Sequence, residues 1–478
     1  QGLSEYWNWQ TSTFTVLDVS PQKYTDLPAS VNAGVADYTT DYFRTGQAWE
    51  TDKGYTAQLY VLDKAGNQGS ATETDFTIDR SSPAAVVVVP YDANKKGLRN
   101  LPSISGTASD NRQNDDVRIA FQQWDGVNNL WYGFDGTGWD FNQSGAYWIS
   151  MKTNGVLSPN ATWWSYAPAG LDGKFTPGTS GFRYMILSRA SDLAGNTQDV
   201  YAADVSSVII TMDKAAPSSG ITLPVDDLGG ALGRYHSSKL GKTATNSRFY
   251  GSSQDGAYTQ YNAGVSVSQI RLTYLSGGDT YYWDQANLNF SSWTVTQTAA
   301  WTGALVGGAG PWTWTFLTDI GWPAGDREYK LEARSMDNSR LSDDTGDGNW
   351  ENPQTRGTNI KYFIVDDSPP LVLITSPTVD ATKALAQIRG TASADIAGHK
   401  WTEARISTTG VDGTKYWTGA GWGTDTWIQA TPDGPTSWYY TVDVSMLKDD
   451  VRYQFEARAR DYADNYSSVY STYSVTYD

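Results

Sequence analysis

The residues of this 478-residue chain that are best suited to bind a ligand are acids in one short segment, Ser342-Asp-Asp-Thr-Gly-Asp-Gly-Asn-Trp-Glu351. Hard oxygen ligands at the spacing of a calcium-binding loop suit Ca²⁺. Positions 1, 3, 5 and 9 of such a loop are taken by Asp343, Thr345, Asp347 and Glu351. The match is partial, because position 12 is Gln354 and not Glu. We predict calcium here, and the alternative is an acidic, solvated insertion.

Two further groups of acidic residues have the chemistry of metal ligands. The first group is a cluster of Asp110, Asn114, Asp115 and Asp116. The second group stands at strand ends, just before linkers that contain proline, and consists of Asp79, Asp213, Asp366 and Asp367. Carboxylates from two neighbouring domains would suit calcium at such a junction. The alternative is that each linker acid only caps a turn.

Aromatic residues recur in hairpins along the chain, which has 21 Trp and 30 Tyr. Their rings can stack on sugars, and such residues are enriched at protein interfaces. The candidates for binding a surface polysaccharide or another protein are Trp139, Trp293 and Trp422. Because the same position is aromatic in several repeats, packing in a core or between modules is the favoured interpretation.

The sequence gives little support to catalysis. It has no Cys and only two His, His236 and His399, so thiol chemistry and a Ser-His-Asp arrangement are not expected. Acids are plentiful, but no pair stands out as the two carboxylates of a glycosidase. No module has acids that the others lack, except for the 343–351 loop. We therefore predict that the chain is not an enzyme.

The charge of the chain also excludes some partners. The net charge is −17 and the basic residues are scattered, whereas nucleic-acid binding needs a basic stripe. No run of about 18 apolar residues is present, so no helical membrane span is expected in this segment. The absence of Cys does not fix the compartment, but it suits a secreted or cell-surface protein.

The candidate residues are carried by a strand-and-turn signature that occurs four times. In each copy an Asp follows a Tyr after eight residues, and the copies start 129, 145 and 124 residues apart. The pairs are Tyr55 and Asp63, Tyr184 and Asp192, Tyr329 and Asp337, and Tyr453 and Asp461. In a turn such as Asp-x-Ala-Gly-Asn, Gly supplies positive φ while Asp and Asn bond the backbone. The Tyr is typical of the tyrosine corner of β-sandwiches.

Other segments repeat in a fixed order around this signature. A proline linker is followed by a Gly-containing strand, an alternating strand, an aromatic hairpin, a Trp-rich strand and the Tyr–Asp strand. This order gives seven or eight short strands in roughly 125–145 residues, which is typical of a two-sheet antiparallel sandwich. The third copy departs most, because its turn is Asp337-Asn-Ser-Arg-Leu341 and an insertion follows it.

The motifs Ile-x-Gly-Thr-Ala-x-Asp, Tyr-Trp-x-Gly-x-x-Trp, Ala-x-Asp-x-Ala-Gly-Asn and Phe-x-x-Asp-x-x-x-Pro together resemble tandem bacterial Ig-like repeats of very long secreted or surface proteins. The resemblance covers nearly the whole chain. It implies an all-β fold of four tandem Ig-like antiparallel β-sandwich domains and a role in surface attachment, adhesion or scaffolding, without catalytic residues. We number the predicted domains as module 1 (1–82), module 2 (83–216), module 3 (217–368) and module 4 (369–478).

Module 1 is predicted to be incomplete at its N-terminus. Its aromatic hairpin begins at Tyr6, where the other modules have already formed two or three strands. Either the chain is an excerpt of a longer repeat protein, or a strand of a neighbouring chain completes the sandwich. In both cases residues 1–82 are not expected to fold alone.

The function predicted from these observations is structural and extracellular. The chain would be a module of a surface filament, a surface layer or an adhesive rod, and its partners would be copies of itself or further repeats of a longer chain. One alternative is a carbohydrate-binding adhesin. Another is an accessory region of a secreted hydrolase.

Overall fold

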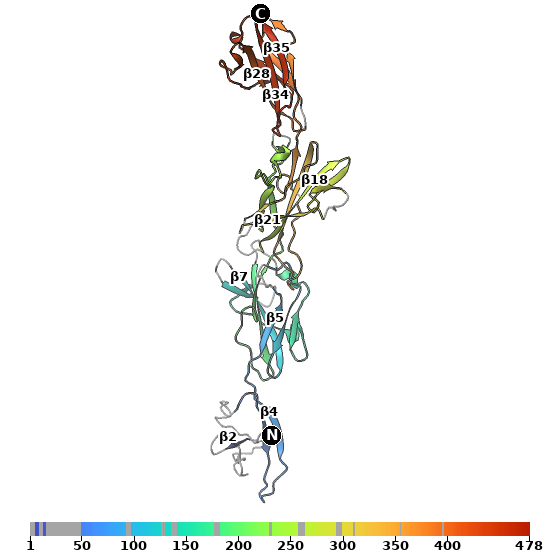
Figure 1. Cartoon of the computed structure of the whole chain (residues 1–478). Helices are drawn as coiled ribbons and strands as arrows, with labels where there is room; N and C mark the ends of the chain where they lie inside the picture. Colours follow the sequence, from blue (N-terminus) through green and yellow to red (C-terminus); the bar gives the residue numbers. More distant parts are fainter. Residues whose placement is uncertain are drawn as a thin grey trace.

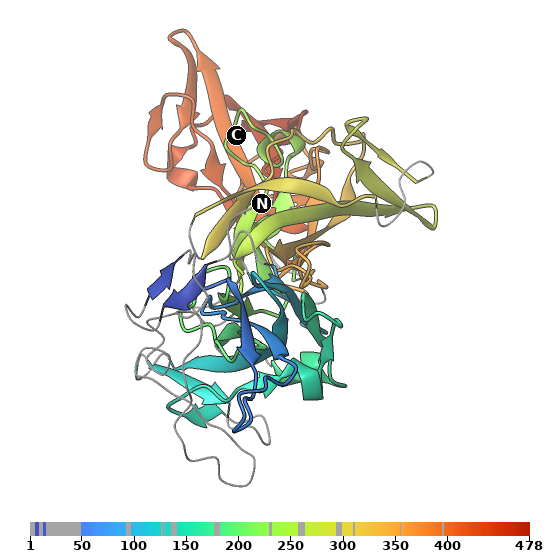
Figure 2. The same ribbon diagram turned by 90° about the horizontal axis from the view of Figure 1, so that it is seen from below.

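The computed structural model describes residues 5–8, 13–15, 49–91, 97–125, 128, 130–134, 141–175, 182–228, 232–256, 263–292, 299–308, 311–353, 355–393 and 396–478. These residues form mostly antiparallel sheets with only short helices, which confirms the predicted all-β class. The modules follow one another in a line from the N-terminus to the C-terminus (Figure 1). The view from below looks along this line and overlays the modules (Figure 2).

Module 2 is a sandwich of two sheets. The smaller sheet has the order β11 (Val156–Leu157), β12 (Trp163–Tyr166), β6 (Ile104–Ser109), β5 (Ala84–Val89). The larger sheet has the order β14 (Ser207–Met212), β13 (Phe182–Asp192), β7 (Asn114–Asp125), β8 (Leu130–Phe134), β9 (Phe141–Gln143), with β10 (Ile149–Ser150) beside β7. Two one-turn helices lie in its loops, α2 (Met151–Asn154) and α3 (Leu171–Lys174).

Module 4 repeats this arrangement. One sheet has the order β25 (Val372–Ser376), β27 (Gln387–Ala392), β33 (Ser437–Thr441), β32 (Thr431–Pro432). The other has the order β26 (Ala381–Thr382), β35 (Ser471–Tyr477), β34 (Val451–Asp461), β28 (His399–Gly410), β29 (Gly413–Trp417), β30 (Trp422–Gly423), with β31 (Ile428–Gln429) beside β28.

Module 3 has the same layers, but one strand joins them. β21 (Thr302–Gly307) pairs with β22 (Trp312–Thr315) of one layer and with β18 (Val265–Ser276) of the other. The first layer is completed by β15 (Ser218–Leu223) and β17 (Tyr250–Gln254). The second is completed by β23 (Arg327–Asp337), β24 (Ile360–Val365), β16 (Arg234–Tyr235), β19 (Asp279–Asp284) and β20 (Asn289–Ser291).

The described part of module 1 consists of two hairpins. β1 (Tyr6–Asn8) pairs with β2 (Thr13–Thr15), and β3 (Gly54–Leu59) pairs with β4 (Thr72–Thr77). The ring of Tyr55 lies 5.2 Å from Phe14, 4.8 Å from Trp49 and 5.7 Å from Phe76, measured between ring centroids. The predicted lack of opening strands involves residues outside the described ones and stays a prediction.

Each complete module has a buried Trp that packs against a Gly on the neighbouring strand. Trp164 lies opposite Gly106, Trp314 opposite Gly251 and Trp438 opposite Gly390. All three Trp side chains are fully buried. The predicted Gly-containing strand and Trp-rich strand are therefore neighbours, and the Gly leaves room for the indole ring.

The Tyr–Asp strand occupies the middle of the larger layer in each complete module. In module 2 it is β13, which lies between β14 and β7, and β23 and β34 have the equivalent places in modules 3 and 4. The backbone N–H of Lys448 donates to the Tyr453 hydroxyl at 2.8 Å, and that of Glu50 donates to the Tyr55 hydroxyl at 2.8 Å. These bonds from five residues upstream confirm the tyrosine corner in modules 1 and 4.

Candidate metal centres at the module junctions

Three buried carboxylates meet where module 2 joins module 3. Asp213 directly follows β14, the last strand of module 2, whereas Asp255 follows β17 and Asp337 ends β23 in module 3. One carboxylate oxygen of each lies within 4.8 Å of the others. The three residues are 5%, 1% and 0% exposed. The junction therefore places one acid from the preceding module against two from the following module.

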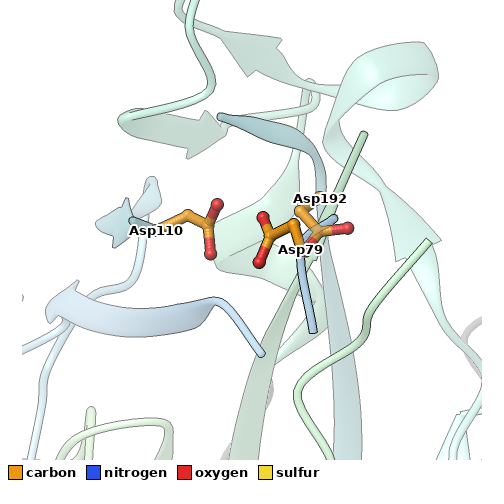
Figure 3. A group of neighbouring side chains, drawn as sticks. All are labelled: Asp79, Asp110 and Asp192. Carbon is orange, nitrogen blue, oxygen red and sulfur yellow. The ribbon is translucent and has the colours of Figure 1, made fainter. Parts of the chain in front are cut away.

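The same arrangement occurs where module 1 joins module 2. Asp79 lies two residues after β4 of module 1, Asp110 follows β6, and Asp192 ends β13. Their carboxylate oxygens also lie within 4.8 Å of one another. The carboxylate of Asp110 faces those of Asp79 and Asp192, which lie side by side (Figure 3). The two junctions thus use equivalent positions of the repeat.

Two of the three equivalent positions are described at the junction of modules 3 and 4. Asp366 directly follows β24, Asp461 ends β34, and both are 0% exposed. The sequence repeat assigns the third position to Asp395, which lies outside the described residues.

We call each group of three acids, Asp79, Asp110 and Asp192 or Asp213, Asp255 and Asp337, a carboxylate trio. The turn after the Tyr–Asp strand links each trio to the preceding module. In module 2, Asn196 donates to both carboxylate oxygens of Asp192, from its backbone N–H and its side-chain amide, at 2.8 Å each. The same amide donates to the backbone carbonyl of Asp79 at 3.0 Å. Asn465 makes the corresponding bonds to Asp461 in module 4. The local turn therefore orients the acid and holds the linker of the module before it.

Module 3 reaches the same geometry although its turn has no Gly-Asn. The backbone N–H and the side-chain amide of Asn349 donate to the two carboxylate oxygens of Asp337 at 2.8 Å each. The amide also donates to the backbone carbonyl of Asp213 at 3.1 Å. Asn349 therefore takes the place of Asn196 and Asn465, although it lies twelve residues after the Asp. The insertion is looped out between the two halves of this hydrogen-bonded unit.

The electrostatics of the trio between modules 2 and 3 call for a counter-charge. Burial, together with repulsion from Asp213 and Asp337, raises the pKa of Asp255 to about 7. Burial also raises the pKa of Asp213. In the part of the chain that the structure describes, neither Asp213 nor Asp337 forms an ion pair with Lys or Arg. Protons or a metal cation can neutralise such a group, and three carboxylate oxygens suit a hard ion such as Ca²⁺.

The predicted calcium loop at 343–351 is not assembled in this way. Asp343 accepts hydrogen bonds from the backbone N–H and the hydroxyl of Thr345, at 3.1 and 2.5 Å. Among the described acids, Asp343, Asp347 and Glu351 do not bring three carboxylate oxygens within 4.8 Å of one another. Position 12 of the loop, Gln354, lies outside the described residues.

Glu351 was predicted to be a calcium ligand of that loop, but its carboxylate accepts hydrogen bonds from other parts of module 3. One oxygen accepts from the backbone N–H of Ser219 at 2.8 Å and from the amide of Asn359 at 2.8 Å. The other accepts from the Ser219 hydroxyl at 2.5 Å and from the backbone N–H of Ser335 at 3.1 Å. With four donors on its two oxygens, Glu351 ties β15 to β23 within module 3.

Some acids of the other two predicted groups belong to the trios, and the others form ion pairs or hydrogen bonds elsewhere. Of the cluster at 110–116, only Asp110 joins a trio, because Asp115 pairs with Lys152 at 2.6 Å and Asp116 with Arg118 at 3.1 Å. Of the linker acids, Asp79 and Asp213 belong to the trios, and Asp366 has the equivalent place. Asp367 accepts instead from the backbone N–H of Ser237 at 2.7 Å and lies 3.5 Å from His236.

Of the three aromatic candidates for binding a polysaccharide or another protein, the structure describes only Trp422. Trp139 and Trp293 lie outside the described residues. Trp422 is half-buried, stacks on Tyr453 with 5.6 Å between ring centroids, and donates from its indole N–H to the carbonyl of Met446 at 3.3 Å. Trp422 therefore packs against the core of module 4.

Another set of Trp residues, which sequence reasoning missed, covers arginines of the Tyr–Asp strands. Trp148, Trp301 and Trp427 hold the guanidinium groups of Arg189, Arg334 and Arg458 at 4.1, 4.2 and 4.4 Å from their ring centroids. Each Arg stands five residues after the signature Tyr, and this spacing is the signal that could have indicated the pairing. These cation–π contacts account for part of the repeated aromatic pattern.

Comparisons with known proteins identify only distant similarity. No family model matches the chain, and no curated protein does. A solved tetra-tandem repeat in the extending region of a large adhesion protein is 15% identical, with 90% of this chain and 82% of that chain covered and a TM-score of 0.26.

Two further solved structures have similar values. One, titled for the host cell surface retention of a 1.5-MDa bacterial ice-binding adhesin, is 14% identical, with 84% and 98% of the chains covered and a TM-score of 0.27. The other, the FN1–FN3 domains of chicken CNTN1, is 12% identical, with 83% and 100% covered and a TM-score of 0.24. Among the described helices, none is long and apolar enough to cross a membrane.

Proposed function

We propose that this chain is a non-catalytic spacer of a secreted or cell-surface protein, in which calcium ions at the module junctions hold successive sandwiches in line. The observation that carries the proposal is the recurrence of the carboxylate trio at two junctions, with one acid from the module before and two from the module after. Because the ligands come from two modules, a cation that binds them fixes the orientation of one module relative to the next. Ligands from a single module could not do so.

Cation binding is coupled to the alignment of the modules. A cation that binds all three carboxylates favours the aligned arrangement over bent arrangements that separate the linker acid from the other two. Neutralisation of three buried carboxylates also removes the repulsion that raises the pKa of Asp255. One bound ion therefore stabilises the fold of the junction and its direction together.

The partners of such a spacer would be further repeats of a longer chain or other copies of the same chain. Its location would be the cell surface or the extracellular medium, within a filament, a surface layer or an adhesive rod. Among the three aromatic candidates for polysaccharide binding, Trp422 gives no support to that role, because it is packed against the core of its own module.

The test is calcium binding by the full chain. Isothermal titration after chelator treatment should detect sites, and calcium at 100 times its dissociation constant should raise the free energy of unfolding by about 2.7 kcal/mol for each coupled site. Asp255→Asn should remove the site between modules 2 and 3, whereas Asp279→Asn, on the exposed tip of β19, should leave every site intact.

Two controls make this test decisive. Magnesium at the same concentration should bind more weakly, because it demands a tighter octahedral site and keeps its waters. A flat titration, with the same unfolding curve in calcium and in chelator, would mean that protons neutralise the trios and that the proposed metal role is wrong.

A further inference from the structure

The turn that follows Asp337 in module 3, together with the start of the insertion behind it, makes backbone contacts with module 2. The backbone N–H of Arg340 donates to the carbonyl of Gly97 at 2.9 Å, and the N–H of Arg99 donates to the carbonyl of Arg340 at 2.8 Å. These two bonds flank Leu98 and make a parallel bridge between Leu98 and Arg340. The turn after Asp337 therefore pairs with module 2 as a strand would.

The segment around Leu98 is itself an edge of the larger sheet of module 2. The N–H of Leu98 donates to the carbonyl of Thr211 at 2.8 Å, and the N–H of Asp213 donates to the carbonyl of Leu98 at 2.8 Å. Leu98 is 0% exposed. Residues 97–99 thus lie between β14 on one side and Arg340 on the other, so that module 3 extends the sheet of module 2 by one position.

Ser342 adds two bonds to this contact. Its N–H donates to the side-chain oxygen of Asn100 at 3.0 Å, and its carbonyl accepts from the N–H of Tyr91 at 2.9 Å. Ser342 is 7% exposed, so these bonds are shielded from water. Four hydrogen bonds between modules are therefore made within residues 340–342, and none of the four uses a residue of the carboxylate trio.

Neighbouring junctions have contacts of another kind. Between modules 1 and 2, Arg112 donates from its guanidinium to the carbonyl of Asp52 at 3.0 Å. Between modules 3 and 4, Arg234 donates to the carbonyl of Ala397 and lies over the ring of Tyr462 at 5.6 Å. These contacts are made by the side chains of single Arg residues, whereas residues 340–342 use paired backbone groups.

We propose that residues 340–342 are a clamp that joins modules 2 and 3 into one rigid unit, whether or not a cation is bound between them. Bending of the chain is then concentrated at the junctions on either side of this unit. The clamp uses hydrogen bonds and no metal ligand. The clamp proposal and the calcium proposal can therefore be tested separately.

The repeat itself supplies the variant that tests the clamp. Replacement of residues 338–349 by Leu-Ala-Gly-Asn, the turn at 193–196 of module 2, removes the insertion but keeps Asp337 and an Asn at the end of the turn. Because the chain has no Cys, spin labels can be placed at Val156→Cys in module 2 and Asp279→Cys in module 3, both exposed positions. Double electron–electron resonance then reports the distribution of distances across the junction.

The expected result is a narrow distribution for the parent chain in calcium and in chelator, and a broad one for the turn replacement in chelator. A parent distribution as broad as that of the replacement in chelator would overturn the clamp. The calcium proposal fails separately, if chelation broadens no junction, including the one reported by a label pair at Asp279→Cys and Lys415→Cys across modules 3 and 4.

Hydrogen exchange on the unlabelled parent chain covers the case in which the replacement does not fold. The amides of Arg340 and Ser342, which donate across the junction, should exchange at least ~10-fold more slowly in chelator than the amide of the exposed Asp347, because a clamped amide exchanges only when the contact opens. Equal exchange at the two places would show that the clamp is open and would overturn the proposal.

Discussion

Single glycines are the tightest constraint at the scale of residues. A Cβ on Gly251 would lie 2.5 Å from Cζ2 of Trp314 and would clash with the carbonyl of Gly220 on the other neighbouring strand. The same two clashes would occur at Gly106 and Gly390 in the other complete modules. These glycines are therefore required by the close approach of an indole ring and a backbone.

We predict that Gly251→Ala destabilises module 3 by about 3 kcal/mol, at the upper end of the usual range for overpacked cores, because neither neighbour is the end of a flexible side chain. Gly303→Ala is the matched control, since Gly303 lies in β21 with no atom within 4 Å of its added Cβ. Urea denaturation of the full chain measures both. Equal losses for the two variants would show that the Trp–Gly contact is not limiting.

At the scale of elements, the Tyr–Asp strand and its turn form one unit that serves two purposes. The strand packs its Tyr in the core, as at Tyr329, which is 1% exposed, and it delivers its Asp to the junction. The Asn of the turn then holds both the Asp and the linker of the preceding module. Loss of this Asn should therefore loosen a junction without opening a core.

We predict that Asn349→Ala lowers the free energy of unfolding by about 1–3 kcal/mol, because it leaves buried acceptors on Asp337 and Asp213 without their donor. Asn352→Ala, an exposed neighbour, should change it by less than about 0.5 kcal/mol. Thermal unfolding of the full chain provides the comparison. If both variants unfold like the parent, the turn does not support the junction.

At the scale of the whole molecule, the chain is a line of sandwiches whose junctions differ. Asp213 and Asp366 are equivalent linker acids, and each accepts a backbone N–H from the following module, from Ala263 at 2.7 Å and from Ala397 at 3.1 Å. Only the junction at Asp213 also has the contacts of residues 340–342 that are described above. The same substitution should therefore have different consequences at the two places.

We predict that Asp366→Asn shortens the maximum dimension of the chain in solution, because module 4 can then bend away from module 3. Asp213→Asn should leave that dimension unchanged, because the clamp still joins modules 2 and 3. Small-angle X-ray scattering of both variants in calcium measures the effect. The opposite order, with Asp213→Asn the more compact variant, would contradict this distribution of stiffness.

Much of this arrangement could be predicted from the sequence because it is local. The eight-residue spacing from Tyr453 to Asp461 places the Tyr in the core and the Asp at the strand end, since side chains of a strand alternate in direction. The proline linkers and the recurring strand order predict the all-β sandwich class in the same way. The linker acids Asp79 and Asp213 were identified as junction residues by their place at the ends of strands.

What the tertiary structure decided is which of these residues meet. Asp110 and Asp255 lie beside Asp192 and Asp337 because the two layers of one module pack together, and Asp79 and Asp213 join them because two modules are packed end to end. Asn349 takes the place of the missing turn residue although it lies twelve residues after Asp337. Glu351 was predicted as a calcium ligand, but its carboxylate connects β15 to β23. Sequence patterns record hydrogen bonds and burial between near neighbours along the chain, whereas contacts between modules depend on how whole sandwiches pack.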